Sequence, residues 1–321
     1  MRGFERIVAV RSGCRTQILG LMVLSALIAV PAAAATLMVG SGQPYKAPSE
    51  AVAAARPGDT IRIAPGTYYD CAIWTTGNLT IEGSGPGVVL TDKICQGKAI
   101  FVIDADNVTV DNLTFARARA ADGNGAGIRA EGINLTVENS KFVDDQDGIL
   151  AGDNPKSTII VRNSEFDHNG ACEEGQGCAH GIYVNHIALL RIEHSRFFDT
   201  QIAHHIKSRA ARTEILDSQI VDGPDGTASY LVDIPNGGSL LMSGNVLEKG
   251  PKNQNHSAAI IIGEEGVSQS TDALLFQHNT FTNDGPPTSF VKNLTAAPAQ
   301  LIGNVLKGGG VMPLIGNATT R

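Results

Sequence analysis

The chain has 321 residues, a formal net charge of −7, 42% hydrophobic residues and only 5% aromatic ones. The excess of acidic over basic residues disfavours nucleic acids and anionic membrane surfaces as partners. It does not exclude an acidic polysaccharide, because a local basic cleft can lie on an acidic protein.

The first 35 residues have the pattern of a secretory signal peptide. Four arginines precede an apolar run over residues 18–30, and the small residues PAAAA follow it. A membrane anchor is the alternative, but the run is shorter than the roughly 20 residues that span a bilayer. We therefore expect residues 1–35 to be removed and residues 36–321 to form one domain. The mature protein is then secreted or periplasmic and does not contact the membrane.

Four cysteines follow this leader, and an even number in an exported chain predicts disulfides. Cys172 and Cys178 enclose only EEGQG and are expected to close a small loop, which leaves Cys71 to pair with Cys95. Zinc binding is the alternative, but the spacings lack the paired C-x₂-C pattern of many zinc sites.

One short helix is expected over residues 48–59, with Ser49 as its N-cap and Pro57-Gly58 as its end. Beyond it, the chain repeats a template of alternating apolar residues, a polar turn pair and a closing apolar residue, as in NLTVENSKF and TIIVRNSEF. The closing residues are spaced 27, 24, 31, 23, 27, 34 and 25 apart, and they are Phe115, Phe142, Phe166, Phe197, Ile220, Leu247, Phe281 and Leu306. Three positions before most of them stands a polar turn residue that can cap backbone groups: Asn112, Asn139, Asn163, His194, Asp217 or His278.

A second strand recurs between these templates, as in GIRAE, GILAG, GIYVN and HIKSR. A period near 25 with several short strands and no long helix is typical of stacked coils, a parallel β-solenoid. We expect about nine coils.

The repeats and the opening AVAAARPGDTIRIAPGTY resemble the right-handed parallel β-helix proteins of the pectate lyase-like superfamily. The resemblance covers about residues 45–310. It implies an all-β, single-stranded right-handed parallel β-helix with a short N-terminal capping helix. That fold is used by lyases, hydrolases, epimerases, phage tailspikes and adhesins, so the resemblance does not give the reaction.

Residues 179–210 hold five of the eight histidines and two strands that align one coil apart, HGIYVN and HHIKSR. Side-chain alternation along a strand predicts which residues point away from the core. One expected outer column is Phe101, Arg129, Leu150, Tyr183, Lys207, Val232 and Ile261. The adjoining column is Ile103, Glu131, Gly152, Asn185, Arg209, Ile234 and Gly263. At the preceding turn we expect Asp147, His180 and His204, with His205 and Tyr230 beside them, whereas Asp233 is expected to point inward.

Such a polar face suits a polysaccharide. To cleave a uronic acid polymer by β-elimination, an enzyme must neutralise the sugar carboxylate, remove the C5 proton and assist the leaving oxygen. We expect Arg209 or Arg129 to neutralise the carboxylate, Lys207 to be the base, and Tyr183 or His180 to be base or acid. The expected substrate-binding residues are Arg129, Glu131, Asn185, His204, His205, Tyr230 and Asp147. The resemblance to alginate and chondroitin lyases implies Lys and Arg on such a face, with or without calcium.

Four alternatives remain open. Asp144, Asp145 and Asp147 offer the two carboxylates of a glycoside hydrolase, although they also suit a polar turn. HGIYVN is similar to the HGI segment of alginate epimerases, whose Asp-Pro-His-Asp element is missing here. The third alternative is a non-catalytic carbohydrate-binding or surface protein, and the fourth is a merely solvated sheet. We assign no metal site, leave calcium open and expect a monomer.

Overall fold

The computed structural model describes residues 1, 3, 9, 13, 33–172 and 177–319. Contacts separate Met1–Ala33 from one compact unit, Ala34–Arg321. Most of the predicted signal peptide lies outside the described residues, so its removal stays a prediction. No helix in the described part of the chain is both long and apolar enough to cross a membrane.

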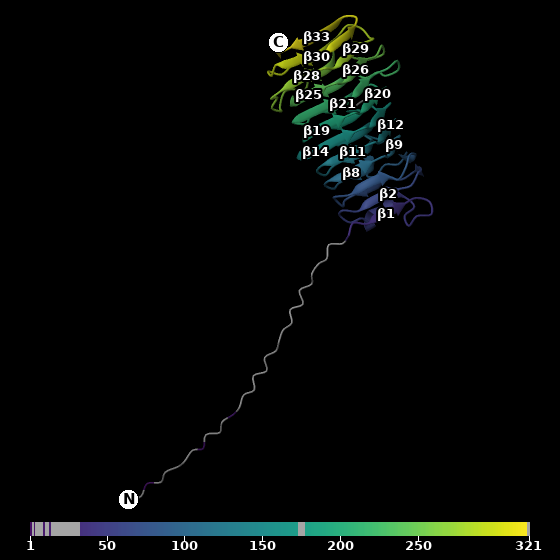
Figure 1. Cartoon of the computed structure of the whole chain (residues 1–321), viewed down its shortest axis with the longest axis vertical. Helices are drawn as coiled ribbons and strands as arrows, with labels where there is room; N and C mark the ends of the chain where they lie inside the picture. Colours follow the sequence, from purple (N-terminus) through teal and green to yellow (C-terminus); the bar gives the residue numbers. More distant parts are fainter. Residues whose placement is uncertain (2, 4–8, 10–12, 14–32, 173–176, 320–321) are drawn as a thin grey trace. The chain divides into compact units, whose positions relative to one another are not determined.

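The compact unit is a right-handed parallel β-helix, and Figure 1 shows its coils stacked in chain order. Three long sheets run the length of the stack, and every neighbouring pair of strands within them is parallel. The sheets contain 12, 10 and 10 strands, so the described residues form slightly more coils than the nine expected.

The 12-stranded sheet consists of β1 (Thr36–Val39), β2 (Thr60–Ile63), β5 (Thr80–Gly83), β8 (Val108–Asp111), β11 (Leu135–Glu138), β14 (Asn154–Arg162), β19 (Ile187–Glu193), β22 (Arg212–Leu216), β25 (Ser239–Ser243), β28 (Leu274–Gln277), β31 (Ala299–Ile302) and β34 (Ala318–Thr319). A 10-stranded sheet, called here the site sheet, consists of β4 (Ala72–Trp74), β7 (Ala99–Ile103), β10 (Ala126–Ala130), β13 (Asp147–Ala151), β18 (Ile182–Val184), β21 (His204–Ser208), β24 (Tyr230–Ile234), β27 (Ala258–Ile262), β30 (Thr288–Asn293) and β33 (Val311–Gly316). The other 10-stranded sheet consists of β3 (Gly66–Tyr68), β6 (Val88–Thr91), β9 (Thr114–Ala116), β12 (Lys141–Val143), β15 (Glu165–Asp167), β20 (Arg196–Phe198), β23 (Gln219–Val221), β26 (Val246–Lys249), β29 (Thr280–Asn283) and β32 (Val305–Gly308).

The closing residues of the repeat form one continuous row in the core, as predicted. Each pairs with its counterpart one coil on, from Phe115 through Phe142, Phe166 and Phe197 to Ile220. The rings of Phe142 and Phe166 stack at 4.6 Å between centroids, and those of Phe166 and Phe197 at 4.4 Å. Because each ring packs on its neighbours, a chain with few aromatic residues still builds a dense core.

The polar turn residues before the closing residues have a backbone role that the repeat did not reveal. All six have positive φ, between 47° and 55°: Asn112, Asn139, Asn163, His194, Asp217 and His278. Asn and Asp tolerate this left-handed conformation better than most residues. It lets the chain bend sharply from the 12-stranded sheet into the next one.

The capping helix is shorter than expected, because α1 spans Pro48–Ala51 and continues as a 3₁₀ turn, η1, over Val52–Ala54. The N-cap is Ala47 and not Ser49. Ser49 instead bonds through its backbone N and Oγ to the carboxylate of Asp70, at 2.8 and 2.9 Å.

Both expected disulfides are present, Cys71–Cys95 and Cys172–Cys178. The second joins the short antiparallel strands β16 (Ala171–Cys172) and β17 (Cys178–Ala179).

Candidate active site

The middle of the site sheet carries a column of outward side chains that differs in part from the predicted one. Register pairing places Arg129, Leu150, Tyr183, Lys207 and Asp233 on successive strands. Four residues predicted to face outward lie instead in the core: Phe101, Ile103, Val232 and Ile234.

The correction has a local cause. In four strands of the site sheet two successive side chains belong to the core, as Leu231 and Val232 do. Strict alternation therefore fails by one position, and Asp233, predicted to point inward, joins Lys207 on the outer face.

Lys207 and Arg209 form a cationic pair that already holds a carboxylate. Lys207 Nζ lies 2.6 Å from Glu265 Oε1, and Arg209 Nη2 lies 2.6 Å from Glu265 Oε2. The Lys207 and Arg209 side chains are 12% and 15% exposed, whereas that of Glu265 is 42% exposed. Burial raises the pKa of Glu265, but the hydrogen bonds from the two cations outweigh it and lower that pKa.

Tyr183 lies one coil before Lys207 and contacts both cations. Arg209 Nε donates a hydrogen bond of 3.1 Å to the Tyr183 hydroxyl oxygen. Lys207 Nζ and Arg209 Cζ each lie 5.7 Å from the centre of the Tyr183 ring, within cation–π distance. The predicted trio of Tyr183, Lys207 and Arg209 thus lies together, with Tyr183 in contact with both cations.

The two histidines of the face belong to a ladder that runs along the preceding turn. His180 N donates to Asp147 Oδ1 at 2.7 Å, His204 N to His180 Nδ1 at 3.1 Å, and Tyr230 N to His204 Nδ1 at 3.2 Å. The His180 and His204 rings stack at 4.8 Å. Because each Nδ1 accepts a hydrogen bond, the proton of each neutral ring is on Nε2.

Burial keeps these histidines neutral. It lowers the pKa of His180 well below its usual range, and nearby cations add to the effect. Burial also lowers the pKa of His204 to about 3, with a further contribution from Lys207. Neutral, buried imidazoles that serve as backbone caps position the face, so Tyr183 is the better placed proton-transfer group.

Three other residues predicted to bind substrate, His205, Tyr230 and Asn185, already have partners within the protein. His205 is not on the face but in the interior, where Nε2 lies 2.8 Å from Asp222 Oδ1. Tyr230 is buried, and its hydroxyl donates to Glu264 Oε1 at 2.9 Å. Asn185 Nδ2 donates to Ala151 O at 2.9 Å.

Arg129 and Glu131 lie on the same face but away from the central trio. Three strand steps separate Arg129 from Lys207 in the column, about 14 Å at the usual strand spacing. Glu131 Oε1 is 3.4 Å from Arg129 Nε and 2.7 Å from Lys98 Nζ. Two cations around one carboxylate leave this end of the face positively charged.

The carboxylates considered for hydrolysis do not form an open pair. Asp145 and Asp147 are buried, and Asp145 Oδ1 accepts the backbone N–H of Ala118 at 2.7 Å. Asp144 pairs with Arg119 at 2.6 Å. The geometry matches the polar-turn interpretation of this segment.

The sequence analysis did not predict the loop that forms one side of the site. Residues 263–273, called here the wall loop, connect β27 to β28 and carry both Glu264 and Glu265. The 34-residue interval between Leu247 and Phe281, the longest in the repeat, was the signal for it.

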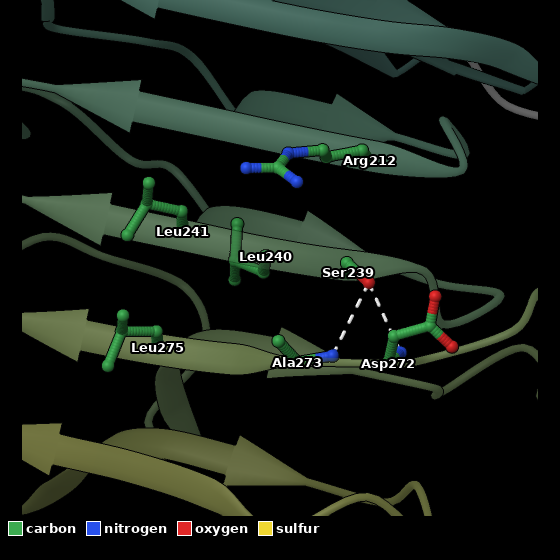
Figure 2. Close-up of a pocket in the computed structure, with 7 residues that line it drawn as sticks. All are labelled: Arg212, Ser239, Leu240, Leu241, Asp272, Ala273 and Leu275. Carbon is green, nitrogen blue, oxygen red and sulfur yellow. Dashed lines mark hydrogen bonds between the residues drawn. The ribbon is translucent and has the colours of Figure 1, made fainter.

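The wall loop is held firmly at several points. Gln269 Nε2 donates to Arg209 O at 3.1 Å, and Asn236 Nδ2 donates to Gly266 O at 3.1 Å. At its far end, Ser239 Oγ accepts the backbone N–H groups of Asp272 and Ala273 at 3.1 and 3.4 Å (Figure 2). The shallow pocket of Figure 2 lies on the 12-stranded sheet, away from the trio, and carries no acid–base pair.

No cluster of three or more His, Cys, Asp or Glu side chains suited to a metal ion occurs among the described residues. The zinc and calcium alternatives therefore gain no support from side-chain geometry.

Asp147 gives a prediction about stability. Its Oδ2 has no hydrogen-bond partner within the described part of the chain, and burial raises its pKa to about 8. Its pKa in the unfolded chain is about 3.9. Between these values the folded state binds the extra proton, so the free energy of unfolding falls by up to about 1.4 kcal/mol per pH unit as pH rises.

Asp147→Asn keeps the acceptor for His180 N and carries no charge, so it should remove this fall. In urea unfolding from pH 4 to 9, the variant should gain stability over the wild type as pH increases. Asp225→Asn, at a fully exposed site, should leave the profile unchanged. Parallel profiles for wild type and Asp147→Asn would refute the assignment.

Comparison with known proteins agrees with this architecture. The family model described as "Right handed beta helix region" matches residues 67–247. No curated protein matches the chain significantly. An alginate lyase from Paenibacillus sp. str. FPU-7 has a similar structure, with a TM-score of 0.62 and 19% identity over 86% of this chain and 99% of that one. The pectate lyase Pel9A also has a TM-score of 0.62, with 15% identity over 89% of this chain and 78% of that one.

Proposed function

The chain belongs to the right-handed β-helix family, and we propose that it is a polysaccharide-active enzyme that cleaves a uronic-acid-containing polysaccharide by β-elimination. The reaction is assigned to the face formed by Tyr183, Lys207 and Arg209. At 19% and 15% identity, the likeness to an alginate lyase and a pectate lyase carries the fold, and the reaction rests on the site.

One observation carries the proposal: a carboxylate is seated between Lys207 and Arg209. Glu265 bridges the two cations with one oxygen on each, at 2.6 Å. A uronate group has the same planar pair of oxygens, so it fits the same two donors. Elimination requires this neutralisation, because removal of the C5 proton places negative charge on the sugar carboxylate.

Tyr183 is placed to move the proton. In the proposed step Tyr183 reacts as its phenolate: its oxygen takes the C5 proton, the C4–C5 double bond forms, and the C4–O glycosidic bond breaks. The leaving oxygen then takes a proton from the same hydroxyl. Arg209 Nε already donates to this oxygen, so a negative charge there meets a guanidinium. Lys207, with carboxylates on two sides, is better suited to be a cation than the base expected from the sequence.

The proposal includes export, with residues 1–35 as a signal peptide. The two disulfides support an oxidising compartment, either the periplasm or the cell exterior. We expect a monomer acting on a polysaccharide, without nucleic acid or membrane partners.

The test is the ultraviolet absorbance of the new conjugated double bond on a panel of acidic polysaccharides, with and without calcium. Wild type should produce it on at least one substrate, and Lys207→Ala and Arg209→Ala should lower the rate by at least about 100-fold. Lys252→Ala and Arg212→Ala, which remove exposed cations outside the proposed site, should retain full activity. New reducing ends without absorbance would indicate a hydrolase, and saturable sugar binding without new ends would indicate a binding protein.

A further inference from the structure

Asp233 is a buried carboxylate beside the proposed site, and the packing of its strand does not require a carboxylate at this position. Only 2% of the residue is exposed. Its Oδ2 lies 3.5 Å from Lys207 Nζ and 3.5 Å from His204 Nε2. Its Oδ1 is buried and makes no hydrogen bond to any residue that the structure describes.

Such an arrangement reduces stability. A buried carboxylate that is only half-partnered loses the hydration of both oxygens and regains little of it. Strand packing requires no acid at this position, since the next residue in the column, Ile261, is apolar and buried. A costly group that contacts a candidate functional cation is a reason to look for a functional role.

The contacts of Lys207 suggest what that role is. Lys207 has two carboxylate partners: Glu265 on the wall loop, partly exposed, and Asp233 on β24, buried. Under the proposed function, the uronate carboxylate of the substrate displaces that of Glu265. Asp233 is then the one carboxylate of the two that still contacts Lys207. The Nε2–H group of His204, whose tautomer is fixed by Tyr230 N, faces the same Asp233 oxygen from the side.

We propose that Asp233 is a positioning residue, which anchors the Lys207 ammonium beside Tyr183 when substrate displaces Glu265. It does not contact substrate. It contacts Lys207 from the buried side, while the substrate carboxylate binds Lys207 from the solvent side.

This role makes the anchoring depend on pH in the neutral range. The groups that face Asp233 are Lys207 and His204 on β21, Glu264 and Glu265 on the wall loop, and the apolar Ile261 on β27. Burial raises the pKa of Asp233 to about 7, against the opposing charge of Lys207. Asp233 is therefore an anion above about pH 7 and loses its hold on Lys207 as pH falls through that value.

The first test does not need activity. In Glu265→Gln, where only Asp233 remains on Lys207, the NMR signal of the Lys207 side chain should show an inflection below pH 7, because the charge of Glu265 helps to raise the pKa of Asp233 in the wild type. Adding Asp233→Asn should abolish it, and adding the exposed control Asp225→Asn should not. Asp233→Ser serves as a second variant should the asparagine not fold. An inflection that persists without Asp233, or none in Glu265→Gln, would overturn the proposal.

The second test uses turnover. Above pH 8, Asp233→Asn should lower kcat by about tenfold with little change in KM, and the acid limb of kcat near pH 7 should disappear. Unchanged kcat with the limb intact would also overturn the proposal. If no polysaccharide is cleaved but the NMR inflection behaves as stated, the contact stands and the lyase assignment fails.

Discussion

Replacing Tyr183 with Phe should lower the rate of β-elimination by about 10²–10⁴-fold, the usual contribution of a positioned acid–base group. The ring stays, so its contacts with Lys207 and Arg209 and its edge-to-face contact with His180 should persist. Only the hydroxyl that accepts the Arg209 hydrogen bond is lost. Substrate affinity should therefore change little, and the loss should appear in kcat.

Steady-state kinetics on the best substrate of the panel checks this, with Tyr69→Phe as the control. Tyr69 is exposed on a different coil, so its variant should match the wild type. A Tyr183→Phe enzyme with more than a tenth of the wild-type kcat would remove Tyr183 from the proton transfer and return Lys207 to the role of base.

The second large effect concerns the fold. Phe166→Ala should lower the free energy of unfolding by about 3–5 kcal/mol, because it opens a cavity in the middle of the ring ladder. Phe166 is fully buried and stacks on Phe142 and Phe197, at 4.6 and 4.4 Å. The missing ring would remove the stacking contact that Phe166 makes with each of these neighbours.

Urea unfolding compares this variant with Phe198→Ala, which removes the neighbouring outward ring in the same sheet. Phe198 is only partly buried, and its ring lies 5.3 Å from the guanidinium carbon of Arg196, so its loss should have a much smaller effect. Equal losses from the two variants would show that the stacked row is not the main source of stability.

The period of the chain was enough to predict the coil architecture. Phe142, Phe166 and Phe197 were expected in one row because the template fixes them relative to their turns, and the register confirms it. The positions of the polar turn residues follow the same template, whereas their left-handed backbone conformation was not predicted. The sequence repeat therefore determines both the row of phenylalanine rings and the positions of the turns.

The outer face was only partly predictable. Tyr183 and Lys207 were expected to be neighbours and are, because their two strands align without a gap. The outward position of Asp233 was missed because Leu231 and Val232 both lie in the core, which breaks alternation. Glu265 was missed because it follows β27, and the loop that carries it is not part of the repeat. It reaches Lys207 across 58 residues of sequence, a contact that no period encodes.

A structure of the Tyr183→Phe variant with a uronic acid oligosaccharide is the most direct test that the Lys207–Arg209 pair binds the sugar carboxylate. We predict that one carboxylate of the oligosaccharide replaces Glu265 within hydrogen-bond distance of both cations, with C5 facing position 183. An oligosaccharide bound elsewhere, with Glu265 still bridging Lys207 and Arg209, would contradict the account.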